Sequence, residues 1–167
     1  MCGLIIQDVA YFKKDELCQL LSFYRNSAIS SLFTLGNIDP ICAFLTEIMN
    51  LNMLKEATFL RGVPSAFIEE IALTKSFDFL CFQAQNFKFP RTFFEELFAK
   101  QFDGSFRTCC FQSFFDFKVG DLKNFRKDQQ IRASNSSIEW RRVDGVVVTL
   151  KNSDWNNSLH VGYYGNC

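Results

Sequence analysis

The chain has 167 residues, 48% of them hydrophobic, which is enough for one domain with a buried core. Its 18 basic and 18 acidic residues give a formal net charge of zero, so the composition offers no basic surface for nucleic acid. No apolar run is long enough for a membrane-spanning helix, and the N-terminus lacks the pattern of a secretory signal. We therefore expect a cytoplasmic protein that binds neither nucleic acid nor membrane.

The residues with the most distinctive chemistry are seven cysteines and a single histidine, His160. The cysteines show no Cys-x-x-Cys spacing, so we expect no metal and no cofactor. Their odd number favours a reducing compartment with free thiols. His160 lies in a predicted strand, where an ordinary hydrogen bond explains it better than a catalytic pair with Cys2.

Strand and helix signals alternate through the first half of the chain. Asp39-Pro40 is a strong helix start, because Asp caps the helix and Pro fits its first position. Asp15 and Ser65 are weaker caps of the same kind. The predicted elements are strands over 2–12 and 29–35, helices over 15–26, 40–49 and 66–74, and either state over 53–60.

The second half is rich in phenylalanine and in strand signals. Thr92 and Glu95 form a capping-box pattern ahead of a helix, and Asp144-Gly145 is a two-residue hairpin signal. Alternation over residues 106–119 places one apolar set on one face. The predicted strands are 77–89, 106–119, 138–143, 146–150 and 159–164, with a loop or exposed helix over 120–133. The pattern indicates an α+β protein with antiparallel strands near both ends.

A stripe of phenylalanines runs from Phe93 to Phe117. Burial in the core is the simpler explanation, because aromatic side chains bury a large apolar area. The alternative is an exposed apolar, Phe-rich patch that binds a protein partner.

The first three residues, Met1-Cys2-Gly3, carry the clearest catalytic hypothesis. Removal of Met1 would leave Cys2 with a thiol and a free α-amine on the same carbon. The amine could then serve as the base for the thiol nucleophile. The alternative is that the tripeptide occurs by chance.

Several segments in chain order resemble the N-terminal glutaminase domain of class II glutamine amidotransferases. The resemblance is closest to the divergent asparagine-synthetase-domain-containing proteins. The matching segments are Met1-Cys2-Gly3, residues 23–31, Phe59-Leu60-Arg61-Gly62-Val63, residues 103–106 and residues 140–151. The resemblance implies an Ntn-hydrolase-like four-layer αββα fold with antiparallel sheets. It also implies a single glutaminase-like domain over residues 1–167, without a C-terminal synthetase domain.

The resemblance also implies roles for three residues. Cys2 would attack the side-chain amide of glutamine, Arg61 would bind the substrate carboxylate, and Gln83 would donate a partial oxyanion hydrogen bond. The family has Asn-Gly where this chain has Gln83-Ala84, and residues 87–102 contain no Asp to bind the substrate amine. Because losing one oxyanion donor costs about 10²–10³ in rate, we expect weak or degenerate ammonia production from glutamine. The alternative is a catalytically inactive, Phe-rich α+β protein-interaction domain.

Overall fold

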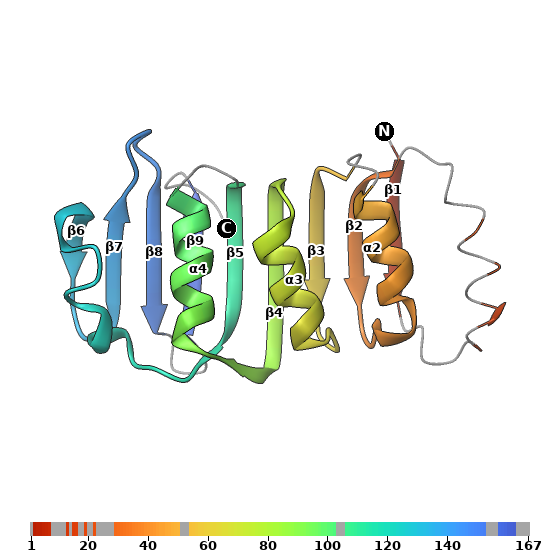
Figure 1. Cartoon of the computed structure of the whole chain (residues 1–167), viewed down its shortest axis with the longest axis horizontal. Helices are drawn as coiled ribbons and strands as arrows, with labels where there is room; N and C mark the ends of the chain where they lie inside the picture. Colours follow the sequence, from red (N-terminus) through yellow and green to blue (C-terminus); the bar gives the residue numbers. More distant parts are fainter. Residues whose placement is uncertain are drawn as a thin grey trace. The chain divides into compact units, whose positions relative to one another are not determined.

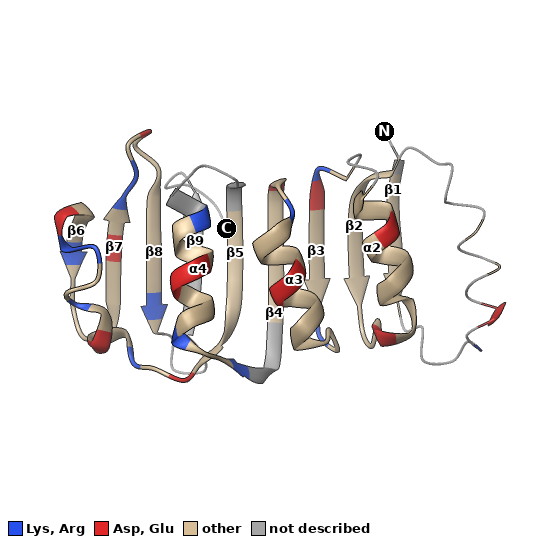
Figure 2. Ribbon diagram, in the orientation of Figure 1, with Lys and Arg blue, Asp and Glu red and all other residues tan. Residues whose placement is uncertain are grey.

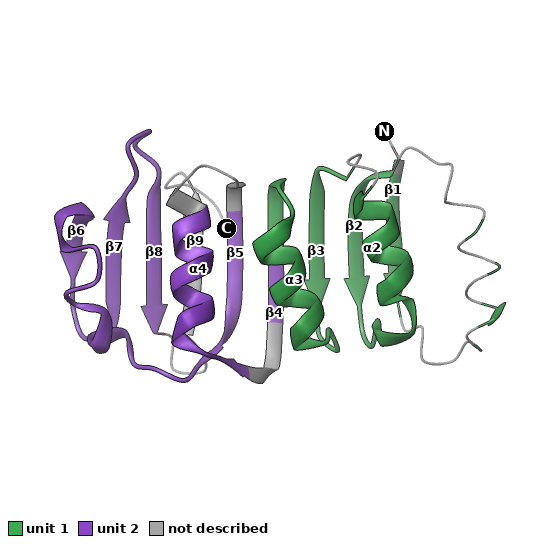
Figure 3. Ribbon diagram, in the orientation of Figure 1, with its two compact units in different colours: residues 1–80 green, residues 81–167 purple. Residues whose placement is uncertain are grey.

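The computed structural model describes residues 2–7, 29–50, 54–102, 106–152 and 157–162, together with residues 13, 15, 16, 19 and 22. These residues form a mixed α/β structure. The chain divides into two compact units, Met1–Leu80 and Cys81–Cys167, coloured separately in Figure 3. The predicted single domain over residues 1–167 stays a prediction.

The first unit is built on parallel strands. Its elements are β1 (Cys2–Gln7), β2 (Ile29–Leu35), a 3-10 turn η2 (Asp39–Ile41), α2 (Cys42–Asn50), β3 (Glu56–Leu60), α3 (Ser65–Thr74) and the start of β4 (Phe77–Phe89). The strands lie in the order β1-β2-β3-β4. β1 pairs with β2 and β2 with β3 in parallel, and the arrow of β4 points the same way (Figure 1).

Helices α2 and α3 cover one face of this sheet (Figure 1). Their buried side chains pack against the alternate strand residues that point to this face. Leu32 of β2 and Phe59 of β3 are both buried on this face. The ring of Phe59 meets the ring of Phe67 in α3 edge-on, with centroids 5.7 Å apart. The neighbouring residues Ser31 and Phe33 point to the opposite face, where they are more exposed.

The parallel pairing corrects the expectation of antiparallel strands near the N-terminus. In the observed register Leu4 pairs with Leu32, and Leu32 pairs with Ala57. Apolar periodicity indicates that a segment is a strand, but it does not specify the direction of the neighbouring strand. Parallel neighbours need a long crossover connection, and α3 lies within the connection from β3 to β4.

The second unit is mainly antiparallel. Its further elements are α4 (Arg91–Phe102), β5 (Phe106–Phe115), η3 (Val119–Leu122), η4 (Lys127–Gln129), β6 (Gln130–Ala133), β7 (Ser137–Arg141), β8 (Val147–Asn152) and β9 (Asn157–Gly162). The strands lie in the order β4-β5-β9-β8-β7-β6. The pairs from β5–β9 to β7–β6 are antiparallel, so the antiparallel prediction is confirmed at this end of the chain.

The predicted hairpin at Asp144-Gly145 connects β7 and β8, but its loop is longer than the predicted two residues, because β7 ends at Arg141 and β8 begins at Val147. The backbone N–H of Arg142 donates to the carbonyl of Val146 at 2.8 Å, which closes the turn. The Arg142 guanidinium also pairs with the Asp144 carboxylate at 2.7 Å. Gly145 takes the positive φ of 86° that this turn requires.

An aromatic cluster forms the core of the second unit. Phe94, Phe98 and Trp140 are fully buried and their rings contact one another. The indole N–H of Trp140 donates to the carbonyl of Phe125 at 3.0 Å, so its polar atom is satisfied. The described phenylalanines of the predicted stripe are therefore mostly core residues, and Phe114 is its most exposed described member at 36%.

Several element predictions are confirmed and others are corrected. The strands at Ile29–Leu35 and Phe77–Phe89 match the structure, and the undecided segment becomes β3. The Asp39-Pro40 signal does mark a helical start, but Asp39 is the first residue of η2 and does not cap it. Ser65 is likewise the first residue of α3, and its side chain makes no cap hydrogen bond. The expected capping box is wrong, because Arg91 already begins α4 and pairs with Glu95 at 2.7 Å. The predicted helix over 15–26 lies largely outside the described residues. None of the helices within the described ranges has the length and apolar character of a membrane span.

The loop after β3 depends on glycine at position 62, so we predict that Gly62→Ala is strongly destabilising. Gly62 has a φ of 57°, and an added Cβ would lie 2.7 Å from the backbone of Gly36. Left-handed backbone and overpacking together should lower the free energy of unfolding by about 2 kcal/mol or more. Urea titration followed by circular dichroism measures this loss.

Gly145→Ala is the matched control, because Gly145 has a φ of 86° but an added Cβ would meet nothing within 4 Å. Its cost should be about 1 kcal/mol, from the backbone conformation alone. Equal unfolding midpoints for the two variants would show that the close approach to Gly36 contributes nothing.

Phe111 and Phe114 on β5 provide a matched pair for the aromatic core. Phe111 is fully buried, and its ring contacts Phe82, Phe89 and Phe93. We expect Phe111→Ala to cost about 3–5 kcal/mol in unfolding free energy and Phe114→Ala less than about 1 kcal/mol. Similar losses in a denaturant titration would contradict the assignment of Phe111 to the core.

Candidate functional site

The first two predicted site residues, Cys2 and Arg61, belong to opposite ends of the parallel strands. Cys2 is the first residue of β1, and its side chain lies outside the described part. Arg61 directly follows Leu60, the last residue of β3. Leu60 pairs with Leu35 at the end of β2, and Leu35 pairs with Gln7 at the end of β1. Six residues of extended strand correspond to about 20 Å along the strand direction, so the two Cα atoms are far apart. The described backbone therefore does not bring Cys2 and Arg61 together.

Arg61 has an unusual backbone conformation. It is exposed and has a φ of 60°, next to Gly62 at 57°. Two successive left-handed residues turn the chain sharply after β3. The structure gives Arg61 a role in this turn.

The third predicted residue, Gln83, lies in the second unit on β4. Its side-chain amide donates a hydrogen bond to the side-chain carbonyl of Gln112 on β5 at 3.1 Å. This donor is thus already engaged with a neighbouring strand. Ala84 has no described side-chain environment.

Two described thiols have perturbed acidities. Burial, together with the nearby carboxylates of Asp39 and Glu70, raises the pKa of Cys42 to about 11. A hydrogen bond from the Cys110 thiol lowers the pKa of Cys81, and burial opposes this effect. His160 lies in β9 opposite Cys110, and its side chain is outside the described part. Within the described residues no cluster of His, Cys, Asp or Glu could hold a metal ion.

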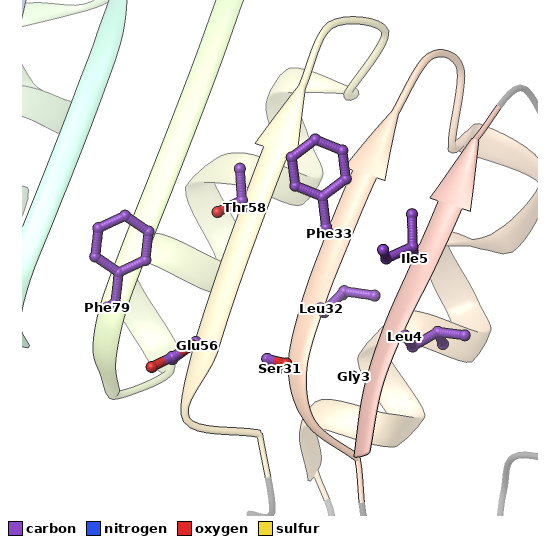
Figure 4. Close-up of a pocket in the computed structure, with 9 residues that line it drawn as sticks. All are labelled: Gly3, Leu4, Ile5, Ser31, Leu32, Phe33, Glu56, Thr58 and Phe79. Atoms are coloured by element: carbon purple, nitrogen blue, oxygen red, sulfur yellow. The ribbon is translucent and has the colours of Figure 1, made fainter. Parts of the chain in front are cut away.

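The first unit has an open hollow on the sheet face opposite its helices, with a volume of about 340 Å³ (Figure 4). We call it the β-face hollow. The strand residues that point into it are Gly3 and Ile5 of β1, Ser31 and Phe33 of β2, Glu56 and Thr58 of β3, and Phe79 of β4.

The parallel register arranges these side chains in two rows across the strands. Gly3, Ser31 and Glu56 form one row. Ile5, Phe33 and Thr58 form the next row, and Figure 4 shows their side chains on the same side of the sheet. Ile5 is 68% exposed, which is high for an isoleucine in a strand. The small residues Gly3 and Ser31 therefore lie beside the bulky apolar residues Ile5 and Phe33.

Glycine at position 3 helps to form the hollow. A Cβ at this position would lie 2.9 Å from the Ser31 hydroxyl, so a larger residue would fill part of the hollow beside Ser31. The strands β1, β2 and β3 carry one charged residue, Glu56, at the start of β3, which is red in Figure 2. The hollow is thus apolar with a single acidic residue at one end.

Sequence reasoning missed the β-face hollow, since its residues come from four segments that only the strand register brings together. A signal was nevertheless present in β2. Ser31 and Phe33 alternate with the core residues Leu32 and Thr34, so Phe33 lies on the face of the strand that points away from the core. A phenylalanine on that face indicates a binding surface.

Comparison with known proteins adds no family. No protein-family model matches the chain, and neither curated proteins nor solved structures give a match. The resemblance to class II glutamine amidotransferases therefore stays a hypothesis based on the sequence segments alone.

Proposed function

We propose that the chain is a non-catalytic protein-interaction domain that binds its partner at the β-face hollow. The observation that carries this proposal is the row of exposed Ile5 and half-buried Phe33 and Thr58 on a sheet face opposite the helices. An exposed strand isoleucine next to a phenylalanine is costly in water, and contact with a partner removes that cost.

The size of the hollow favours a protein partner over a small molecule. Its volume of about 340 Å³ is at the low end of ligand pockets, and it is open along the sheet. A small molecule there would leave much of its surface in water. A protein can insert one or two apolar side chains and cover the surrounding strands with the rest of its surface.

The charge of the hollow indicates the partner's chemistry. Glu56 lies beside apolar residues and is exposed. We therefore expect an apolar side chain of the partner against Phe33 and a basic residue near Glu56. The apolar contact should supply most of the affinity, since a charge pair at an exposed rim contributes only about 0–1 kcal/mol.

Substitutions in the hollow test this proposal. Phe33→Asp should weaken the binding of a partner by at least about tenfold, because it places a charge against the partner's apolar side chain. Glu56→Lys should weaken binding less, and reversing the charge of the partner's basic residue should restore it. The partner is captured by affinity purification with mass spectrometry, and its affinity is then measured by calorimetry with purified proteins.

Ile131→Asp is the control, because Ile131 is 45% exposed on β6 in the second unit. A genuine partner is retained by Ile131→Asp and lost from Phe33→Asp, while circular dichroism shows that both variants are folded. If Phe33→Asp retains every protein that the unmodified chain binds, the proposed site is wrong.

A glutaminase of the class II amidotransferase type is the second candidate function. The observation in its favour is that Cys2 begins a strand, as the resemblance requires of the nucleophile. The four-layer αββα fold belongs to this proposal, and the parallel pairing of β1 with β2 argues against it. The separation of Cys2 from Arg61 along the strands also argues against it.

Ammonia release from glutamine distinguishes the two functions. We expect the chain to release no more ammonia than Cys2→Ala, because Cys2 and Arg61 do not meet. Mass spectrometry of the purified chain shows in parallel whether Met1 is removed. Ammonia release that requires Cys2 would instead establish the glutaminase and set aside the non-catalytic proposal.

A further inference from the structure

Strands β4 and β5 are neighbours in the sheet, and two side-chain pairs define their register. The rings of Phe82 and Phe111 lie 5.5 Å apart on one face of the sheet. The side-chain amides of Gln83 and Gln112 form a 3.1 Å hydrogen bond on the other face. In both pairs the residue on β5 is 29 positions after its partner on β4. A constant separation of this kind means that the two neighbouring strands are parallel and share one register.

The same register places Cys81 opposite Cys110, on the face that carries the glutamine pair. The Cys110 thiol donates a hydrogen bond to the Cys81 sulfur, so the two sulfur atoms are neighbours. This bond lowers the pKa of Cys81, although burial opposes it. Cys81 is partly exposed, whereas Cys110 is 6% exposed, so Cys81 is the thiol that a reagent from solution meets first.

We propose that Cys81 and Cys110 form a reactive dithiol site, which a hydroperoxide oxidises to an intramolecular disulfide between β4 and β5. Both cysteines are in the reduced thiol form in the structure. Paired Cα atoms on neighbouring strands are about 4.8 Å apart, inside the range of roughly 4.4–6.8 Å that a disulfide spans. The strands need not separate or slide for the bond to form.

The reaction takes two steps and consumes one peroxide. The Cys81 thiolate attacks a peroxide oxygen, so an S–O bond forms, the O–O bond breaks and hydroxide leaves as water after taking a proton. The Cys110 sulfur then attacks the sulfur of the Cys81 sulfenic acid. The S–S bond forms, the S–O bond breaks, and the departing hydroxide takes the Cys110 thiol proton to give a second water. Two thiols are oxidised and one peroxide is reduced.

The neighbouring cysteines are poorer reaction partners. Cys109 precedes Cys110 on β5, and its side chain points to the opposite face, where it is buried. Cys42 lies in the first unit, and its raised pKa keeps it protonated at neutral pH. These differences make the predicted disulfide selective.

Tryptic peptide mapping after treatment with hydrogen peroxide tests the proposal. Cleavage places Cys81 in the peptide 76–88 and Cys110 in the peptide 108–118, which also contains Cys109. The Cys109→Ser variant removes this ambiguity. We expect these two peptides to be joined after oxidation, with the loss of two hydrogen atoms, and to separate again on reduction with dithiothreitol.

Cys42→Ser should leave the joined peptide unchanged, whereas Cys81→Ser should abolish it. If Cys81→Ser does not fold, mapping of the unmodified chain and of Cys109→Ser decides the question alone. The proposal is overturned if Cys81 and Cys110 remain separately alkylated at peroxide levels that oxidise other cysteines. It is also overturned if Cys81 joins a different cysteine.

Discussion

Parallel pairing of strands that follow one another in the chain is the constraint on which the first unit depends. Parallel neighbours cannot be joined by a tight turn, so each connection must return along the length of the strand. Such crossovers are right-handed, and when strand order does not reverse they all lie on one face of the sheet. Helices α2 and α3 lie together for this reason, and the β-face hollow is the result on the other face.

Strand–helix pairs stacked in sequence order are also the building principle of repeat proteins. In those proteins each repeat contacts only the next repeats along the chain, and the strand face without helices forms an extended binding surface. The equivalent positions Leu4, Leu32 and Ala57 share one core row, although the surrounding residues show no sequence repeat. The second unit uses a different solution, in which a dense aromatic core supports antiparallel strands.

The sequence predicts the elements of this chain better than their arrangement. Ile29–Leu35 and the hairpin at Asp144-Gly145 are recognisable because their signals are local: β-branched and apolar residues in one case and turn chemistry in the other. The sequence predicts a loop or exposed helix over 120–133, whereas the structure has β6 at Gln130–Ala133. These four residues are mostly exposed, so no run of core residues marks the strand. The direction of β1 relative to β2 depends on a long connection, which leaves no trace in the strands themselves.

The same limit applies to the sites. Cys2 and Arg61 are chemically suggestive, but their separation follows only from the register of three strands. Conversely, neither Gly3 nor Glu56 suggests a binding site in the sequence. The strand register brings them into one row of the hollow, because Ser31 pairs with both residues. Cys81 and Cys110 are likewise ordinary cysteines until the alignment of Gln83 with Gln112 shows that they face each other.

Strand β1 of the first unit and strand β6 of the second unit differ in their protection against self-association. β6 is short and carries Arg132, and a charge on an edge strand discourages the addition of another strand. β1 is longer, has no charged residue, and has a paired neighbour on one side among the described strands. An uncharged apolar edge of this kind is a template for strand addition from a second molecule. Among the described strands, β1 is therefore the one at which charge least opposes strand addition from a second molecule.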